Sequence, residues 1–232
     1  MRKSRSIRSY LTSQETISGA VYFAFQIFLL SGLLQWFNGK LSHPLNTAEL
    51  NFVYYLINFM AMLLIYHDFL GSSARQVGQH PAYFCQAVIL GFVAYYACSW
   101  CLNHLFEWIA PGYTNANDAS IAALSRGNFF LMAIGTIVLV PPVEECFYRG
   151  LIFRNLYSVS RLGAYIVSMA AFSFIHIIGY IHSYTPWQLI LCFLQYMPAG
   201  LCLAWSYTKS DTIFAPIVIH ALVNATAIGF LR

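Results

Sequence analysis

Three polar motifs interrupt apolar stretches in the second half of the sequence. The first, Pro141 to Arg149, contains two adjacent prolines, two adjacent glutamates and an arginine. The second runs from Phe172 to His176, and the third from His220 to Asn224. Carboxylates and imidazoles are the groups that most often transfer protons in catalysis, and Asn and His donate hydrogen bonds to developing negative charge. Within apolar stretches such side chains are costly, so together they predict a functional site. The candidate residues are Glu144, His176, His220 and Asn224.

The spacing within the first motif separates the two glutamates. Glu145 and Arg149 are four residues apart with the glutamate first, which is the favoured order for an ion pair on a helix. Glu144 lies about 100° further round the helix and does not share this pairing. The adjacent prolines, Pro141 and Pro142, predict a broken helix whose inner segment starts near the glutamates, where free N–H groups favour anions.

Depth along the chain supports a common layer. At about 1.5 Å per residue, Glu144 and His176 lie roughly 20 and 21 Å from the inner ends of their helices. Asn224 lies roughly 17 Å and His220 roughly 11 Å from the inner end of theirs. Taken singly, His176 fits a hydrogen-bonded bundle histidine equally well, and His220 with Asn224 fits interhelical hydrogen bonding. Together with an unpaired glutamate at similar depth, they favour a site.

The composition identifies the environment of these residues. Of 232 residues, 9% are charged and 59% are hydrophobic, and the mean hydropathy is +0.62. An ordinary soluble domain has about 25% charged residues. This chain could not cover a water-exposed surface, which excludes a soluble enzyme, a disordered chain and a disulfide-rich secreted module. We therefore expect an integral membrane protein, surrounded by the lipid bilayer and without a nucleic-acid partner.

Seven stretches are long and apolar enough to cross a bilayer as helices, which predicts an all-α, polytopic transmembrane helix bundle. Basic residues near the predicted loops are more numerous on the side of the N-terminus, which predicts an N-in orientation. Four of them precede the first stretch: Arg2, Lys3, Arg5 and Arg8. No small-x-small site follows that stretch, so we expect a span rather than a cleavable signal peptide. The stretches are roughly Ile17–Phe37, Leu50–Phe69, Tyr83–Phe106, Asn128–Tyr157, Leu162–Ile181, Trp187–Tyr207 and Ile213–Leu231.

The chain reads as one integral membrane domain, residues 1–232. Residues 1–125 hold three N-terminal spans without an assignable role, and residues 126–232 hold the four spans that carry the motifs. Gly71 to Ser73 predict a turn between the second and third spans. The only long connection, residues 107–127, is expected to contain a short interfacial helix. Cys98 and Cys101 form a Cys-x-x-Cys that we interpret as packing within a span.

The three motifs, in this order on separate spans, resemble those of the CAAX-protease and bacteriocin-processing family (CPBP, or Abi) of intramembrane proteases. The family pattern is Glu-Glu-x-x-x-Arg, then Phe-x-x-x-His, then His-x-x-x-Asn. This sequence has it at Glu144 to Arg149, Phe172 to His176 and His220 to Asn224. The resemblance extends from about Gly127 to the end of the chain. The family includes the Ras-converting CAAX endopeptidase.

The resemblance implies a role for each residue. Glu144 would be the general base, His176 would position or activate water, and His220 with Asn224 would stabilise the oxyanion. The residues expected to support the site are Glu145, Arg149 and Phe172. No cofactor is expected, mainly because the resemblance implies a glutamate-dependent mechanism without a metal. In addition, the sequence has no His-Glu-x-x-His motif, and Asn is an unusual zinc ligand. The alternative is a zinc site made by Glu144, His176 and His220.

The function implied is that of an intramembrane endopeptidase acting on a membrane-associated peptide or protein, by CAAX-type or peptide-precursor processing. We expect it in a bacterial plasma membrane. The alternative is a non-proteolytic membrane scaffold or a bacteriocin self-immunity protein with the same fold. A transporter is disfavoured, because only one proline-broken span is visible where related halves should both have one.

Overall fold

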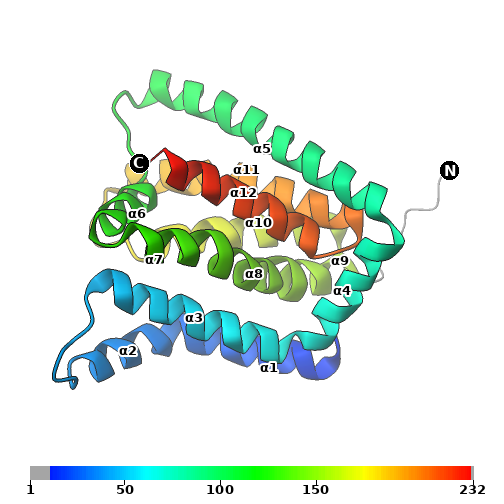
Figure 1. The fold of residues 1–232 in the computed structure, drawn as a ribbon. Coiled ribbons are helices and arrows are strands. Elements are labelled where there is room, and N and C mark those ends of the chain that lie inside the picture. The colour runs from blue at the N-terminus through cyan, green and yellow to red at the C-terminus, as the bar shows by residue number, and fades with distance from the viewer. Residues whose placement is uncertain (1–10, 231–232) are drawn as a thin grey trace.

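The computed structural model describes residues 11–230, and every regular element in that range is a helix (Figure 1). Arg2, Lys3, Arg5 and Arg8, which contribute to the predicted orientation, lie outside the described residues. The α-helices are α1 (Ser13–Phe25), α2 (Ser31–Asn38), α3 (Thr47–Ile65), α4 (His67–Gln79), α5 (Pro81–Ile109), α6 (Ala116–Gly127), α7 (Phe129–Ile134), α8 (Val140–Glu145), α9 (Arg154–Tyr157), α10 (Arg161–Ile178), α11 (Pro186–Ser210) and α12 (Phe214–Gly229). The π-helical turns are η1 (Gln26–Leu30), η2 (Gly135–Leu139) and η3 (Cys146–Phe153).

Six helical segments of the described residues are long and apolar enough to cross a membrane. The seventh predicted stretch forms α12, which is apolar but only 16 residues long. The all-α polytopic bundle is thus confirmed, and the N-in orientation stays a prediction. The six segments are Ser13–Asn38, Thr47–Ile65, Pro81–Ile109, Phe129–Tyr157, Arg161–Ile178 and Pro186–Ser210.

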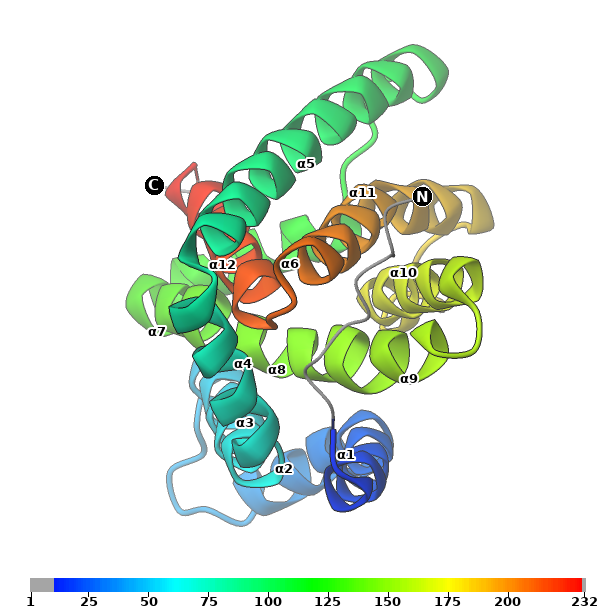
Figure 2. The same ribbon diagram turned by 90° about the vertical axis from the view of Figure 1, so that its right-hand side faces the viewer.

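The motif-bearing helices form the middle of the bundle. Figures 1 and 2 show α5 on one side of them and α1, α2 and α3 on the opposite side. Helix α5 packs along α11 and α12, while α3 packs on α8 and η2. The faces turned outward carry large exposed apolar side chains, among them Phe28, Leu64, Ile89 and Phe130. Such faces suit contact with lipid chains, so the costly polar residues are kept for the interior.

The fourth span is continuous, and the predicted break at the prolines is wrong. Helical structure runs without interruption from Phe129 to Tyr157, through α7, η2, α8, η3 and α9. The π-helical turn η2 ends at Leu139, two residues before Pro141, and the Val140 N–H bonds to the Gly135 carbonyl, five residues back. This wider turn absorbs the missing proline donors and relieves the clash of the ring with the preceding turn.

The turn predicted at residues 71–73 is also wrong, whereas the short helix predicted within residues 107–127 is present. Gly71 to Ser73 lie inside α4, because Phe69 and Ser73 are buried on one face of that helix and the Ser72 hydroxyl donates to the Phe69 carbonyl. The long connection contains α6, a helix capped by Asn115, whose side chain accepts hydrogen bonds from the backbone N–H groups of Asn117 and Asp118.

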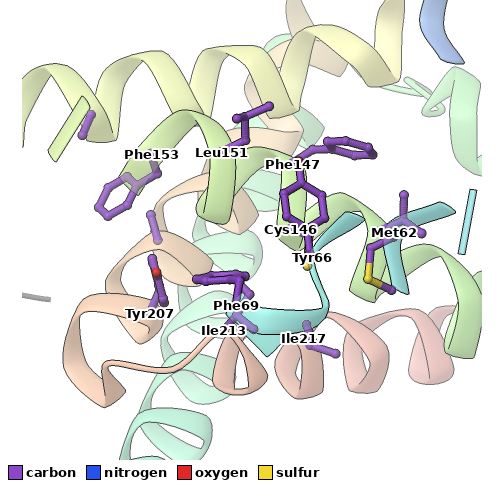
Figure 3. Close-up of a cluster of buried hydrophobic side chains, with 13 residues drawn as sticks. Met62, Tyr66, Phe69, Cys146, Phe147, Leu151, Phe153, Tyr207, Ile213 and Ile217 are labelled. Carbon is purple, nitrogen blue, oxygen red and sulfur yellow. The ribbon is translucent and has the colours of Figure 1, made fainter. Parts of the chain in front are cut away.

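An aromatic core fixes the rotation of η3. Phe147 and Phe153 of η3 are buried with Tyr66 and Phe69 from the junction of α3 and α4, and with Tyr207 of α11 (Figure 3). Tight packing of this kind drives helix association in lipid, where burying apolar surface contributes little. With one face of η3 held in this core, the Arg149 side chain is directed toward α10 and α11.

Candidate active site

Three charged or titratable side chains form a buried cluster between the fourth span and α12. Oε1 of Glu145 accepts a hydrogen bond from an Arg149 guanidinium nitrogen at 3.0 Å. The same oxygen lies 2.9 Å from Nδ1 of His220, which therefore donates to it. Glu145 and Arg149 are fully buried and His220 is 6% exposed. The predicted ion pair is present, and the carboxylate also sets the orientation of the imidazole.

Arg149 is held on three sides. Its second terminal nitrogen donates to the Gly200 carbonyl at 3.3 Å, and its guanidinium carbon lies 4.5 Å from the centre of the Phe172 ring. Gly200 sits where α11 approaches α10 closely, since an added Cβ would come within 2.9 Å of the Met169 Cα. The glycine therefore brings the α11 backbone within reach of Arg149. A fork of donors on a stacked plane suits arginine and not lysine.

Glu144 has the environment expected of a reactive carboxylate. Its Oε2 has no hydrogen-bond partner among the described residues and lies 4.0 Å from Nε2 of His220. The carboxylate also lines a cavity of about 890 Å³. His220 thus stands between two carboxylates, bonded through one ring nitrogen to Glu145 and directed through the other toward Glu144.

His176 faces the same cavity from α10. Its Nδ1 lies 2.7 Å from the Phe172 carbonyl, one helical turn back, and must donate because a carbonyl only accepts. In neutral imidazole this leaves Nε2 as an acceptor. Phe172 contacts both imidazoles, with ring centres 4.7 Å from His176 and 5.8 Å from His220. Phe172 therefore packs against both histidines.

Asn224 donates a hydrogen bond to the backbone of the fourth span. Its Nδ2 donates to the Thr136 carbonyl at 2.8 Å. This carbonyl would bond to residue 140 or 141 in a helix, but the Val140 N–H bonds to Gly135 and Pro141 has no N–H. Asn224 therefore satisfies a carbonyl that the proline released. Its amide retains a second N–H, which is the donor available for any other role.

We expect Asn224→Ala to destabilise the bundle by about 1 kcal/mol, because the Thr136 carbonyl loses its donor within the membrane. The matched control is Asn155→Ala, since Asn155 bonds a carbonyl of its own helical segment, that of Leu151. Thermal unfolding of the purified variants in one detergent measures the difference. Equal midpoints for the two variants would contradict this role of Asn224.

The structure brings the four candidate residues into one region, but only two of them line the cavity. Glu144 and His176 line the cavity, whereas His220 and Asn224 reach the fourth span from α12 behind it. Among the described residues, no three His, Cys, Asp or Glu side chains converge in a way that could hold a metal ion. The alternative zinc set, Glu144, His176 and His220, stays a prediction.

Two parts of the cavity went unnoticed in the sequence. The first is a polar stripe on α3, whose members Thr47, Asn51, Tyr54 and Asn58 all line the cavity. Their spacing of three or four residues in an apolar span is a signal that could have found them. The second is the start of α6, where Asn117 and Ser120 also line the cavity. Short polar residues in a connecting segment give no such signal.

Two side chains of α11 are hydrogen-bonded to the start of α6, which lies in the connection between two spans. The Tyr196 hydroxyl lies 3.0 Å from the Asn117 amide nitrogen and 3.2 Å from an Asp118 carboxylate oxygen. Asn115 donates to Gln195 at 2.9 Å. Desolvation raises the pKa of the Asp118 carboxyl above its ordinary value, and the hydrogen bond from Tyr196 opposes this shift.

The bundle and its buried cluster define an integral, multi-pass membrane protein with a carboxylate–imidazole site. Residues 126–226 match the family model described as type II CAAX prenyl endopeptidase Rce1-like. This match covers less than half of the chain and supports the resemblance to the CAAX-protease family that the three motifs predicted. Comparison with curated proteins found no match, and comparison with solved structures found none either.

Proposed function

We propose that the chain is an intramembrane endopeptidase that hydrolyses a peptide bond with a water molecule activated by Glu144. The family supports a CAAX-type endopeptidase, and the mechanism is our proposal. The observation that carries it is the unpartnered Oε2 of Glu144, buried at a cavity wall 4.0 Å from the His220 imidazole. A carboxylate that only stabilised the bundle would be paired, as Glu145 is.

The distance between Glu144 and His220 fits one shared water molecule. A water at about 2.8 Å from each atom can bridge a separation of 4.0 Å. Glu144 removes a proton from this water, and the oxygen attacks the peptide carbonyl carbon. His176, which lines the same cavity and whose Nε2 can accept a hydrogen bond, orients the water.

The charges of the buried cluster balance when His220 is protonated. Glu144 and Glu145 contribute two negative charges, and Arg149 with an imidazolium at His220 contributes two positive charges. Because Nδ1 already donates to Glu145, donation from Nε2 requires this doubly protonated ring. In that state Nε2 of His220 is a donor directed at the reaction site.

The donors then stabilise the tetrahedral intermediate. His220 through Nε2 and Asn224 through its second amide N–H donate to the oxyanion; each such donor contributes about 3–4 kcal/mol in a dry site. The proton held by Glu144 passes to the leaving nitrogen as the C–N bond breaks. The products are a carboxylic acid and an amine, and the carboxylate at Glu144 is restored.

The cavity indicates an extended peptide segment as substrate. Amide side chains of α3 and α6 line it, and amides match the donors and acceptors of a peptide backbone. A membrane-associated substrate would reach this wall laterally from the bilayer. We propose two roles for this reaction. One is CAAX-type processing, and the other is the processing of peptide precursors in a bacterial plasma membrane.

The test is hydrolysis by the purified protein in lipid vesicles. Peptides with a prenylated C-terminal Cys-aliphatic-aliphatic-x sequence are compared with the same peptides unprenylated, and products are identified by mass spectrometry. We expect cleavage in H₂¹⁸O to place one ¹⁸O in the new carboxylate, with activity retained after chelator treatment. Loss of activity with a chelator and recovery with zinc would establish the metal alternative. Absence of cleavage of every peptide would favour a non-proteolytic scaffold.

A further inference from the structure

The second ring against His176 belongs to Tyr196, a residue that none of the three motifs contains. The two rings stack with centres 4.0 Å apart and planes inclined by 23°. Phe172 packs against the imidazole as well, at 4.7 Å and 50°. The hydrogen bond from Nδ1 to the Phe172 carbonyl fixes the rotation of the imidazole about its bond to Cβ. Together, one hydrogen bond and two rings define the direction of Nε2.

The hydroxyl of Tyr196 connects this stack to the start of α6, where Asn117 and Ser120 line the cavity. It accepts from the Asn117 amide and donates to Asp118, both in the first turn of α6. The neighbouring Gln195 accepts from Asn115, the residue that caps the same helix. Asn117 and His176 both line the cavity, so Tyr196 contacts two residues that line the same cavity.

We infer that Tyr196 is a positioning residue: its ring holds the imidazole of His176 in the reactive orientation, and its hydroxyl holds α6 over the cavity. This inference rests on the proposed function, in which His176 orients the water. The ring and the hydroxyl of Tyr196 then contribute to two different steps of the reaction. The ring acts on the chemical step through His176, and the hydroxyl acts on substrate binding through α6.

Two substitutions separate these halves. Tyr196→Leu removes the ring and the hydroxyl, whereas Tyr196→Phe retains the ring alone. The matched control is Tyr165→Leu, because Tyr165 also joins α10 to α11, through Thr208, but lies eleven residues before His176. Tyr165→Leu therefore removes a part-buried tyrosine that is hydrogen-bonded between the same helices, and it leaves the His176 stack intact.

We expect Tyr196→Leu to lower kcat about 10- to 100-fold, since a displaced catalytic group costs rates of this order. Tyr196→Phe should restore kcat to within about threefold of wild type and raise KM, because α6 loses its attachment. Tyr165→Leu should keep the wild-type kcat. Equal kcat for Tyr196→Leu and Tyr165→Leu, or no recovery in Tyr196→Phe, would overturn the inference.

A second readout does not depend on cleavage. Diethyl pyrocarbonate modifies accessible imidazoles, and mass spectrometry assigns the modified residue. We expect His176 to react severalfold faster in Tyr196→Leu than in wild type, Tyr196→Phe or Tyr165→Leu. If Glu144→Gln proves as active as wild type while this pattern holds, the proposed function fails and the positioning of His176 by Tyr196 stands. An unchanged rate in Tyr196→Leu overturns the positioning role itself.

Discussion

Replacing Glu144 by Gln lowers kcat of peptide cleavage by about 10²–10⁴-fold, the range expected when a general base is removed. The amide has the same shape as the carboxylate but cannot take a proton from water. It also leaves the neighbouring Glu145–Arg149 pair in place, so the unfolding midpoint should change little. Steady-state cleavage in vesicles and thermal unfolding in detergent give the two measurements.

The matched control for this substitution is Glu49→Gln. Glu49 lies in the first turn of α3, where its side chain accepts from the Asn46 backbone, and it does not line the cavity. Gln can make the same capping interaction, so activity should equal that of wild type. If Glu144→Gln cleaved as fast as Glu49→Gln, Glu144 would not be the base.

Arg149→Met destabilises the bundle by about 3–5 kcal/mol, because it leaves the fully buried Glu145 without its guanidinium partner. The cost lies in the unpaired charge and not in lost volume, since methionine fills similar space. The double variant Glu145→Leu, Arg149→Met removes both charges and should be more stable than Arg149→Met alone. Equilibrium unfolding by added SDS in mixed micelles compares the three proteins.

Arg75→Met is the control for loss of an arginine. Arg75 is exposed on α4, and substitutions at such positions change stability by less than about 0.5 kcal/mol. Arg149→Met and Arg75→Met with the same unfolding curve would show that the buried pair contributes nothing. A double variant less stable than Arg149→Met would show that Glu145 is retained chiefly for its bond to His220.

The pairing within the motifs was predictable because it depends on local spacing. Glu145 and Arg149 are four apart on a helix, and the ion pair follows from that geometry. The separation of Glu144 from this pair follows from the same rule, and so do the apolar helices, from the length of their runs. Such features need no knowledge of how distant segments meet.

The details that required the structure are those that depend on contacts between two segments distant in the sequence. The proline pair predicts a broken helix, but the chain continues through a π-helical turn, and an amide from α12 bonds the released Thr136 carbonyl. Tyr196 looks like any apolar aromatic of a span, and only its stacking with His176, twenty residues away, distinguishes it. Neither Asn224 nor Tyr196 carries a sequence signal for the partner it contacts.

The unbroken fourth span constrains how this chain can diverge. Each residue turns a helix by about 100°, so one residue inserted or deleted between Gly135 and Arg149 would rotate the carboxylates out of register with the imidazoles. A π-helical turn holds one residue more than the α-helical turn it replaces, so its width is part of that register. Length variation among descendants should therefore collect in residues 39–46 and 110–115, while this stretch changes only by substitution.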